Sequence, residues 1–234
     1  MQKIGIIGGI GPESTIAYYR LLIKSFQDTL NTKQYPEIII LSIDMTQMLN
    51  YVFTNQLEKL IIFLKEKIEI LEQSNVDYVA MASNTPHLVI DQLADLVATK
   101  MISIVDETCK TIKNSGLKKV GLLGTKSTMS KGFYQKKAAL KHIEIVVPDE
   151  KDQDYIHTKY MDELVFNHIN PETKKHFLKI INNLQEQQGI EGIILGGTEL
   201  PLLLNQQDFK HLKVFNTTEI HVNALVNKMV ANTF

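Results

Sequence analysis

The feature that most constrains the fold of this chain is an internal repeat. Residues 3–8 read KIGIIG, and residues 119–124, which begin 116 residues later, read KVGLLG. The segment 76–86 likewise resembles the segment 190–201, which begins 114 residues later. Two matches at nearly the same separation predict two similar lobes, each of which repeats one supersecondary pattern.

Short apolar runs alternate with longer amphipathic ones along the chain. The short runs predict buried strands, because they are too brief for helices and are bounded by Gly, Pro, Ser or Asn; they are Ile4–Ile7, Glu37–Leu41, Tyr78–Met81, Val120–Leu123 and Gly192–Leu195. The longer runs predict helices at Ser14–Leu30, Gln56–Glu72, Asp91–Thr99 and Glu172–Gln187. Alternating strands and helices predict an α/β protein whose parallel sheets are flanked by helices. Ligands of such sheets bind beyond the carboxyl ends of the strands.

The repeat also predicts the domain organisation. Residues 1–104 together with 212–234 are expected to form the first α/β lobe, and residues 105–211 the second. The segment from Lys213 on has no counterpart between the lobes. We therefore expect it to cross back and pack on the first lobe.

Charge and cysteine content exclude several classes of function. A formal net charge of −1 argues against a nucleic-acid partner or an anionic membrane, because both need a positive field. Cys109 is the one cysteine of the sequence, so no internal disulfide forms, and this fits a reducing cytoplasm. The longest apolar runs, such as 38–41, are far shorter than the ~20 residues of a membrane span. The histidine spacing does not suggest zinc, so we expect no metal.

A glycine-rich loop, Gly8–Ser14, follows the first predicted strand. It is either a turn that starts a closely packed helix or an anion-binding loop at a helix N-terminus. A dinucleotide site is disfavoured by the spacing. The G-x-G-x-x-G pattern counted from Gly9 requires glycine at position 14, where Ser14 stands, and the acid Asp44 comes too late.

Two small polar loops stand at matching places in the repeat. The first consists of Ser83, Asn84 and Thr85, with a proline next to it at the start of a predicted helix. Its hydroxyls, amide and helix N–H groups suit a carboxylate-sized anion, whereas the alternative is a simple helix cap. The mirrored loop Gly196–Glu199 favours binding, because a cap need not recur at the symmetric place with Thr and an acid.

Two further residues have competing interpretations. His87 lies four residues after Ser83 and is either a general base, since its ordinary pKa of about 6.5 suits proton transfer, or a histidine buried for structural reasons. Cys109 lies away from every strand-end loop and is interpreted as a packing residue.

At these loops the sequence resembles the aspartate/glutamate racemases, which are cofactor-independent amino-acid racemases. The resemblance runs the length of the chain, over 4–15, 76–87, 120–134, 192–203 and 214–221. It implies two pseudo-symmetric lobes with the site in the cleft between them, a homodimer, no cofactor, and an isomerase of amino-acid metabolism. In this family two thiols transfer protons on opposite faces of the substrate α-carbon.

The resemblance assigns roles to residues of this sequence. The positions of the two family cysteines hold Ser83 and Gly197 here, and a serine hydroxyl is a much weaker acid than a thiol. Candidate acid and base groups are therefore Ser83 on one face and Glu199, Thr198 or a water over Gly197 on the other, with His87 as activator. The implied substrate-binding residues are Ile10, Gly11, Asn84, Thr85, Gly196 and Thr198.

Three functions remain compatible with these residues. The first is an amino-acid racemase with altered acid and base groups. The second is a catalytically inactive homologue that binds or senses a small carboxylate. The third is other α-carbon or carboxylate chemistry, such as decarboxylation or cis–trans isomerisation. The expected ligand is a small amino acid or carboxylate, and the arginine that many racemases use for the substrate carboxylate is missing from 45–55.

Overall fold

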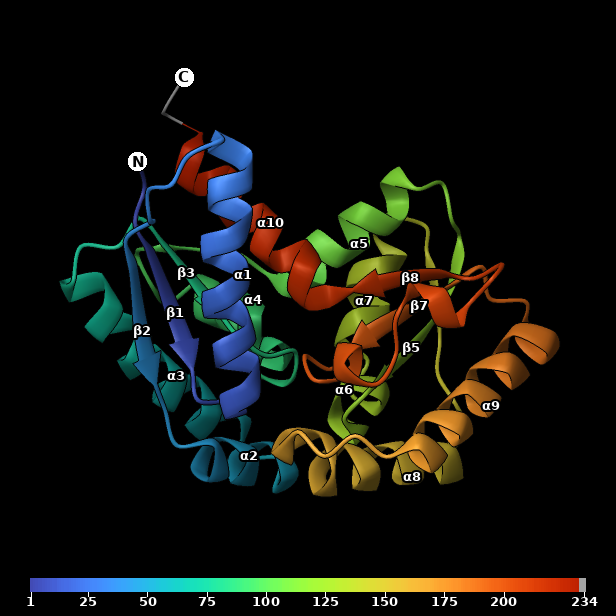
Figure 1. Cartoon of the computed structure of the whole chain (residues 1–234). Coiled ribbons are helices and arrows are strands. Elements are labelled where there is room, and N and C mark those ends of the chain that lie inside the picture. Colours follow the sequence, from blue (N-terminus) through green and yellow to red (C-terminus); the bar gives the residue numbers. More distant parts are fainter. Residues whose placement is uncertain (232–234) are drawn as a thin grey trace. The chain divides into compact units, whose positions relative to one another are not determined.

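The structure, a computed structural model, describes residues 1–231 and divides into two compact units (Figure 1). Unit 1 comprises Met1–Ile104 and the segment from Thr218 on, and unit 2 comprises Val105–Thr217. Each unit contains its own four-stranded parallel sheet. Within the described residues, no helix has both the length and the apolar character needed to cross a bilayer.

The sheet of unit 1 has the strand order β2-β1-β3-β4. Its strands are β1 (Ile4–Gly8), β2 (Ile38–Ser42), β3 (Tyr78–Met81) and β4 (Lys100–Met101). Its helices are α1 (Pro12–Leu30), α2 (Met45–Phe53), α3 (Leu57–Gln73), the 3-10 helix η1 (Thr85–Val89), α4 (Ile90–Ala94) and, at the end of the chain, α10 (Thr217–Val230).

Alternating side chains of the central strands divide the apolar core of unit 1 into two layers. Ile4 and Ile6 of β1 face the layer that contains α1 and α10. Ile7, with Val79 and Met81 of β3, faces the layer formed by α2 and α3. Both faces of the sheet are covered, which explains why these strands are apolar runs without polar alternation.

The sheet of unit 2 has the order β6-β5-β7-β8, which repeats the order of unit 1 with the same parallel pairing. Its strands are β5 (Lys119–Gly124), β6 (Glu144–Val146), β7 (Gly192–Gly196) and β8 (Lys213–Asn216). Its helices are α5 (Ile104–Asn114), α6 (Lys126–Ser130), α7 (Phe133–Ala139), α8 (Glu150–Asp162), η2 (Leu164–Phe166), α9 (Pro171–Gln188), η3 (Leu200–Leu202) and η4 (Gln206–Asp208). The predicted α/β class with two similar parallel sheets is therefore confirmed.

Two sequence-based boundaries need correction. The helix predicted at 91–99 is shorter, because the five-residue α4 ends at Ala94 and follows directly after η1. The second boundary lies between Thr217 and Thr218 and not before residue 212, because β8 pairs with β7 and so belongs to the sheet of unit 2. A four-residue strand with one fully buried side chain gives too weak a pattern to be placed from sequence.

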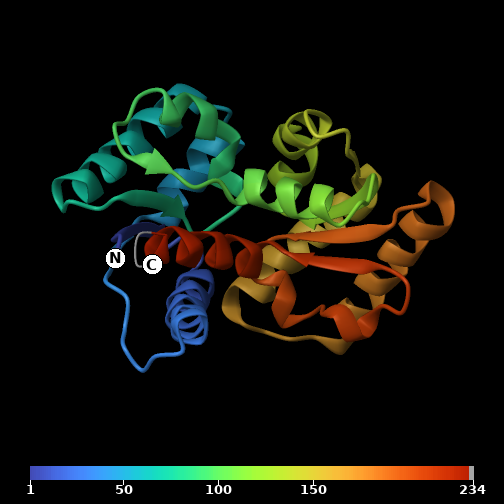
Figure 2. The same ribbon diagram turned by 90° about the horizontal axis from the view of Figure 1, so that it is seen from above.

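The C-terminal helix returns to unit 1, as the sequence analysis expected. Val222, Leu225 and Val226 of α10 share a buried cluster with Tyr18 and Leu22 of α1. The backbone N–H of Gln2 donates to the carbonyl oxygen of Met229 at 3.0 Å, so the start of the chain lies beside the end of α10 (Figure 2).

Candidate functional site

In unit 1 the fold brings the loops after β1 and β3 together. The two strands are paired, with Ile7 opposite Met81. Beyond the pair, the N–H of Ala82 donates to the carbonyl oxygen of Ile7 at 2.9 Å, and the Ser14 hydroxyl donates to the carbonyl oxygen of Ala82 at 2.5 Å. The predicted site segments 9–14 and 83–85 are thus neighbours at the carboxyl edge of one sheet.

The glycine-rich loop has a packing explanation. Gly9 has φ +80°, and a Cβ there would lie 2.5 Å from the Ser42 hydroxyl and 2.6 Å from the Ile43 carbonyl oxygen. Its N–H donates to the Thr15 hydroxyl at 2.8 Å, which closes the turn onto the first part of α1. Only glycine combines this dihedral angle with so close an approach. Ile10 and Gly11 follow in the same loop and are buried.

The loop after β3 is buried but does not begin with a side-chain cap. Ser83, Asn84 and Thr85 are each less than one-tenth exposed. Asn84 precedes η1 without a capping hydrogen bond from its side chain, so the simple-cap interpretation does not hold. The helix expected to strengthen an anion site is only a five-residue 3-10 turn, so its dipole contributes less than predicted.

His87 is fixed by the backbone on both sides of its ring. The N–H of Ile104 donates to Nε2 at 3.2 Å, so this nitrogen carries no proton. Nδ1 therefore carries the proton and donates to the carbonyl oxygen of Ser83 at 2.9 Å. His87 is 1% exposed, and its hydrogen bonds favour the structural interpretation over that of a general base.

His221 of α10 is a second buried histidine in the same unit. Its Nε2 donates to the carbonyl oxygen of Ile102 at 2.9 Å, and the Tyr18 hydroxyl donates to its Nδ1 at 2.8 Å. Complete burial lowers the pKa of His221 from 6.5 to about 4. Its ring meets that of His87 edge-to-face at 6.1 Å, so two neutral histidines tie α1, α10 and η1 together.

In unit 2 the loops after β5 and β7 are neighbours in the same way, because Gly124 pairs with Gly196. A Cβ on Gly124 would lie 2.6 Å from the Gly196 carbonyl oxygen, and one on Gly196 would lie 2.8 Å from the Leu123 carbonyl oxygen, which explains why both strands end in glycine. Thr125 then caps α6 by accepting the Thr128 N–H at 3.2 Å. The predicted binding residues Gly196 and Thr198 lie at this edge of the sheet.

Glu199 holds the one carboxylate of the loop after β7. It is 2% exposed, and its Oε2 accepts hydrogen bonds from the Tyr160 hydroxyl and, at 2.8 Å, from the Thr198 hydroxyl. Burial, and then the neighbouring Glu199 carboxylate, raise the pKa of Tyr160 well above its usual value. Tyr160 is therefore neutral, and its hydroxyl donates a hydrogen bond to the carboxylate of Glu199.

Gly197 lies directly beneath the Tyr160 ring. A Cβ at this position would lie 2.4 Å from Cε2, 2.9 Å from Cζ and 3.0 Å from the hydroxyl oxygen of Tyr160. Tyr160 is not among the residues predicted from the sequence, because it belongs to the strongly polar helix α8. The signal that was available is the four-residue spacing of Ile156 and Tyr160, which marks the buried stripe of that helix.

Other features of the described residues lie outside this arrangement. No group of three or more His, Cys, Asp or Glu side chains within 1–231 is placed to hold a metal ion. Cys109 is fully buried in α5, and burial raises the pKa of its thiol to about 12, which confirms its interpretation as a packing residue.

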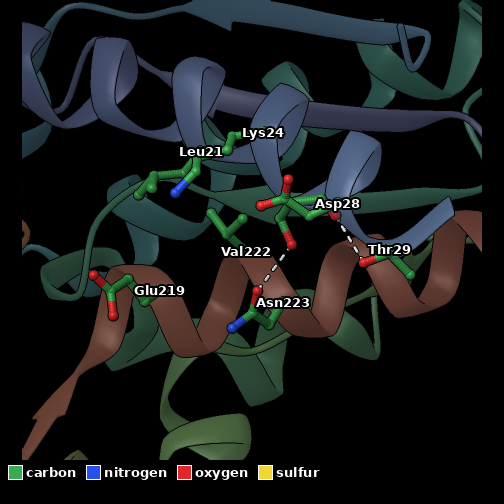
Figure 3. Close-up of a pocket in the computed structure, with 8 residues that line it drawn as sticks. Leu21, Lys24, Asp28, Thr29, Glu219, Val222 and Asn223 are labelled. Carbon is green, nitrogen blue, oxygen red and sulfur yellow. Dashed lines mark hydrogen bonds between the residues drawn. The ribbon is translucent and has the colours of Figure 1, made fainter. Parts of the chain in front are cut away.

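A surface hollow of about 540 Å³ lies between α1 and α10 (Figure 3). Its lining includes Lys24, Asp28, Glu219 and Asn223, and none of its lining residues is a predicted site residue. The Ser25 hydroxyl donates to the Asn223 side-chain oxygen at 2.9 Å across it. This hollow is therefore a separate feature of unit 1.

Comparison with known proteins agrees with the resemblance seen in the sequence. The family model described as Asp/Glu/Hydantoin racemase matches residues 7–225. The crystal structure of an aspartate racemase homologue from Pyrococcus horikoshii OT3 is 37% identical, with a TM-score of 0.85 over 98% of this chain and 99% of that one. The broad specificity amino-acid racemase RacX of Bacillus subtilis is 27% identical over 208 residues, or 86% of this chain and 87% of RacX.

A more distant solved structure shares the fold. The glutamate racemase from Aquifex pyrophilus is 19% identical and has a TM-score of 0.61 over 97% of this chain and 83% of that one. Its two-lobed α/β architecture matches the two parallel sheets described above. On the family match over 7–225 and the likeness to the Pyrococcus protein, this chain belongs to the Asp/Glu/Hydantoin racemase family.

Proposed function

We propose that this chain is a cofactor-independent amino-acid racemase whose thiol pair is replaced by other acid and base groups. The observation that carries the proposal is the Glu199 carboxylate, which stands at the carboxyl end of β7 and accepts hydrogen bonds from Tyr160 and Thr198. Ligands of parallel α/β sheets bind at this edge. Glu199 is also the one carboxyl side chain of the two loops, and a carboxylate is a common general base.

In the proposed reaction, the proton on the substrate α-carbon passes to a Glu199 carboxylate oxygen and leaves a carbanion stabilised by the substrate carboxylate. On the opposite face, the Ser83 hydroxyl gives a proton to the α-carbon and takes one from water. Glu199 then gives its proton to the hydroxide left by that water, which restores the enzyme without net proton uptake. The same steps taken backwards account for the opposite direction of inversion. General acid–base groups of this kind contribute about 10²–10⁴-fold in rate.

The remaining loop residues are proposed to hold the substrate. Asn84 and Thr85, with the backbone of Ile10 and Gly11, would bind the α-carboxylate on the side of unit 1. Gly196 and Thr198 would contribute on the side of unit 2. The single arginine of the sequence, Arg20, is exposed on α1, so we do not assign a guanidinium clamp, and the proposed substrate is a small amino acid of unspecified side chain.

A second candidate function is binding of a small carboxylate without turnover. Two observations favour it: Gly197 offers no side chain for proton transfer, and Ser83 is a weak acid. This candidate keeps the same binding residues and removes only the chemistry. The homodimer implied by the resemblance is common to both candidates and is measurable by light scattering coupled to size exclusion.

Deuterium incorporation separates the two candidates. We expect the purified protein, incubated in D₂O without added cofactor with a panel of L- and D-amino acids, to deuterate the α-carbon of at least one of them. Mass spectrometry detects the product, and the Ser83→Ala variant is the matched control in which exchange falls. Stabilisation of the protein by a panel member without deuteration of any would favour the binding candidate and contradict the racemase.

A further inference from the structure

We propose that Tyr160 occupies the space of a side chain at position 197, so that Tyr160, Gly197 and Glu199 form one interlocked group that takes the place of a thiol. The packing part of this inference needs only the structure. The part that concerns Glu199 as a base rests on the proposed function. Tyr160 is in this account a positioning residue, which acts through Glu199.

Two ring carbons and the hydroxyl oxygen of Tyr160 lie close to the position of a Cβ at residue 197. The three atoms of Tyr160 nearest to a Cβ at position 197 are Cε2, Cζ and the hydroxyl oxygen, at 2.4, 2.9 and 3.0 Å. Carbon atoms in protein cores approach to about 3.5–4.0 Å. Any side chain at position 197 therefore requires the Tyr160 ring or the loop backbone to move.

The ring is restrained against such a movement. Tyr160 is 6% exposed, and its hydroxyl donates to Glu199, which is itself 2% exposed. Displacing the ring would separate this donor from a buried carboxylate and open space around it. Losing a hydrogen-bond partner of a buried charged group is costly. The two positions are therefore coupled: the aromatic residue at 160 is compatible with glycine at 197 and disfavours cysteine there.

The coupling between positions 160 and 197 also explains how the Glu199 carboxylate is held in place for proton transfer where a thiol is absent. The Tyr160 hydroxyl lies 3.0 Å from the Cβ position of residue 197 and hydrogen-bonds to Glu199 Oε2. Apart from the two chain neighbours of Gly197, the polar atom nearest to the missing side chain is thus the phenol oxygen, and the phenol also hydrogen-bonds the carboxylate. With Thr198, Tyr160 gives Glu199 two donors that limit its rotation.

A double-mutant cycle on thermal unfolding tests the packing. We expect Gly197→Ala to lower the apparent Tm by roughly 3–8 °C in the wild-type background, because overpacking a core is destabilising. Tyr160→Phe retains Cε2 and Cζ, so the same drop should appear there. Tyr160→Leu removes all three crowding atoms, so Gly197→Ala should cost less than about 2 °C in that background. Tyr160→Met provides the same test if the leucine variant does not fold.

An equal effect of Gly197→Ala in all backgrounds, or no effect in the wild type, would overturn the coupling. This result does not depend on any enzymatic activity. The positioning role is tested by Tyr160→Phe alone, which keeps the ring and removes only the donor. We expect the exchange rate at saturating amino acid to fall about tenfold or more, with KM unchanged. An unchanged rate would refute the positioning role, whereas absence of exchange in the wild type would refute the proposed function and leave the packing result to stand.

A thiol introduced at position 197 gives a final check. Gly197→Cys combined with Tyr160→Leu should react with a thiol reagent under native conditions, while Cys109 stays buried and unreactive. Gly197→Cys should lower the unfolding temperature of the wild type by more than it lowers that of the Tyr160→Leu variant. A Gly197→Cys protein as stable as wild type would contradict the interlocked group.

Discussion

The loops after β3 and β7 stand at equivalent places in two sheets of the same strand order, yet they are supported by different chemistry. In unit 1 the loop is held by His87, a neutral ring whose two nitrogens bond the backbone at Ser83 and Ile104. In unit 2 it is held by a phenol–carboxylate pair, Tyr160 and Glu199. The hydrogen bonds of His87 to the backbone maintain the shape of its loop, whereas the Glu199 carboxylate is also able to accept a proton.

The difference indicates how a duplicated fold diverges. The backbone of each loop is fixed by strand pairing, and glycine at the strand end is demanded by close approach in unit 2. The side chains beneath the loop are free to differ between the units. Under the proposed function, the base Glu199 is therefore held by side chains in unit 2, whereas the loop of unit 1 that carries Ser83 is held by a neutral histidine.

The largest effect that follows from this comparison is on proton exchange. Glu199→Gln keeps the size of the side chain and removes the base, so we expect α-proton exchange to fall about 10²–10⁴-fold. The matched control is Glu191→Gln. Glu191 precedes β7 and accepts the N–H groups of Lys118 and Lys119 at 2.7 and 2.9 Å. Exchange should persist in the control, and a similar loss in both variants would remove Glu199 from the chemistry.

An intermediate effect is expected on the stability of unit 1. His221→Phe removes the hydrogen bonds of this ring to the Tyr18 hydroxyl and the Ile102 carbonyl oxygen, which we expect to cost about 2–4 kcal/mol in the free energy of unfolding at pH 8. Chemical denaturation measures this difference. The control is His211→Gln, because His211 is exposed and its replacement should be nearly neutral.

The same histidine predicts the direction of the pH dependence. The folded-state pKa of His221 is lowered to about 4, below the 6.5 of an unfolded histidine. Between these values the unfolded chain binds a proton that the folded chain refuses, so stability is present above pH 6.5 and is lost as the pH falls toward 4. The loss amounts to about 3 kcal/mol. His221→Phe should lack this component, and an equal slope in both proteins would contradict a neutral buried His221.

The smallest effect concerns the second donor to Glu199. Thr198→Val removes the hydroxyl that donates to Oε2 at 2.8 Å and leaves Tyr160 in place. We expect a loss of about 1 kcal/mol in unfolding free energy and a decrease in exchange rate of no more than about tenfold. The control is Thr198→Ser, which keeps the hydroxyl donor. Thr173→Val in α9 is not a suitable control, because the Thr173 hydroxyl itself donates to Glu163.

Sequence reasoning recovered the features that depend on local pattern and repetition. The repeat of 3–8 at 119–124 predicted two similar parallel sheets, and strands such as β1 and β5 are apolar enough to be found alone. Strands β4 and β6 were missed because two or three residues carry no usable periodicity. The helix predicted at 91–99 was too long, because α4 ends at Ala94 and residues 95–99 form turns and bends before β4.

Some residues of the candidate site could be predicted from local sequence pattern, and others could not. Glu199 and Ser83 were predicted from the sequence because they follow apolar strands in a repeated loop. Tyr160 was not found, because its contact with Gly197 is long-range and its helix is polar on most faces. The role of His87 was left open, since only the positions of Ser83 O and Ile104 N decide which ring nitrogen carries the proton.

If this chain moves the α-proton of an amino acid without a thiol, α-deuteration and inversion should occur without any contribution from Cys109. The most direct measurement follows α-deuteration and inversion together, in D₂O with no added cofactor, for the wild type, Cys109→Ala and Glu199→Gln. We expect deuterated product of both configurations from the wild type and from Cys109→Ala, and neither from Glu199→Gln. Absence of α-deuteration across the amino-acid panel, or its disappearance in Cys109→Ala, would contradict the account.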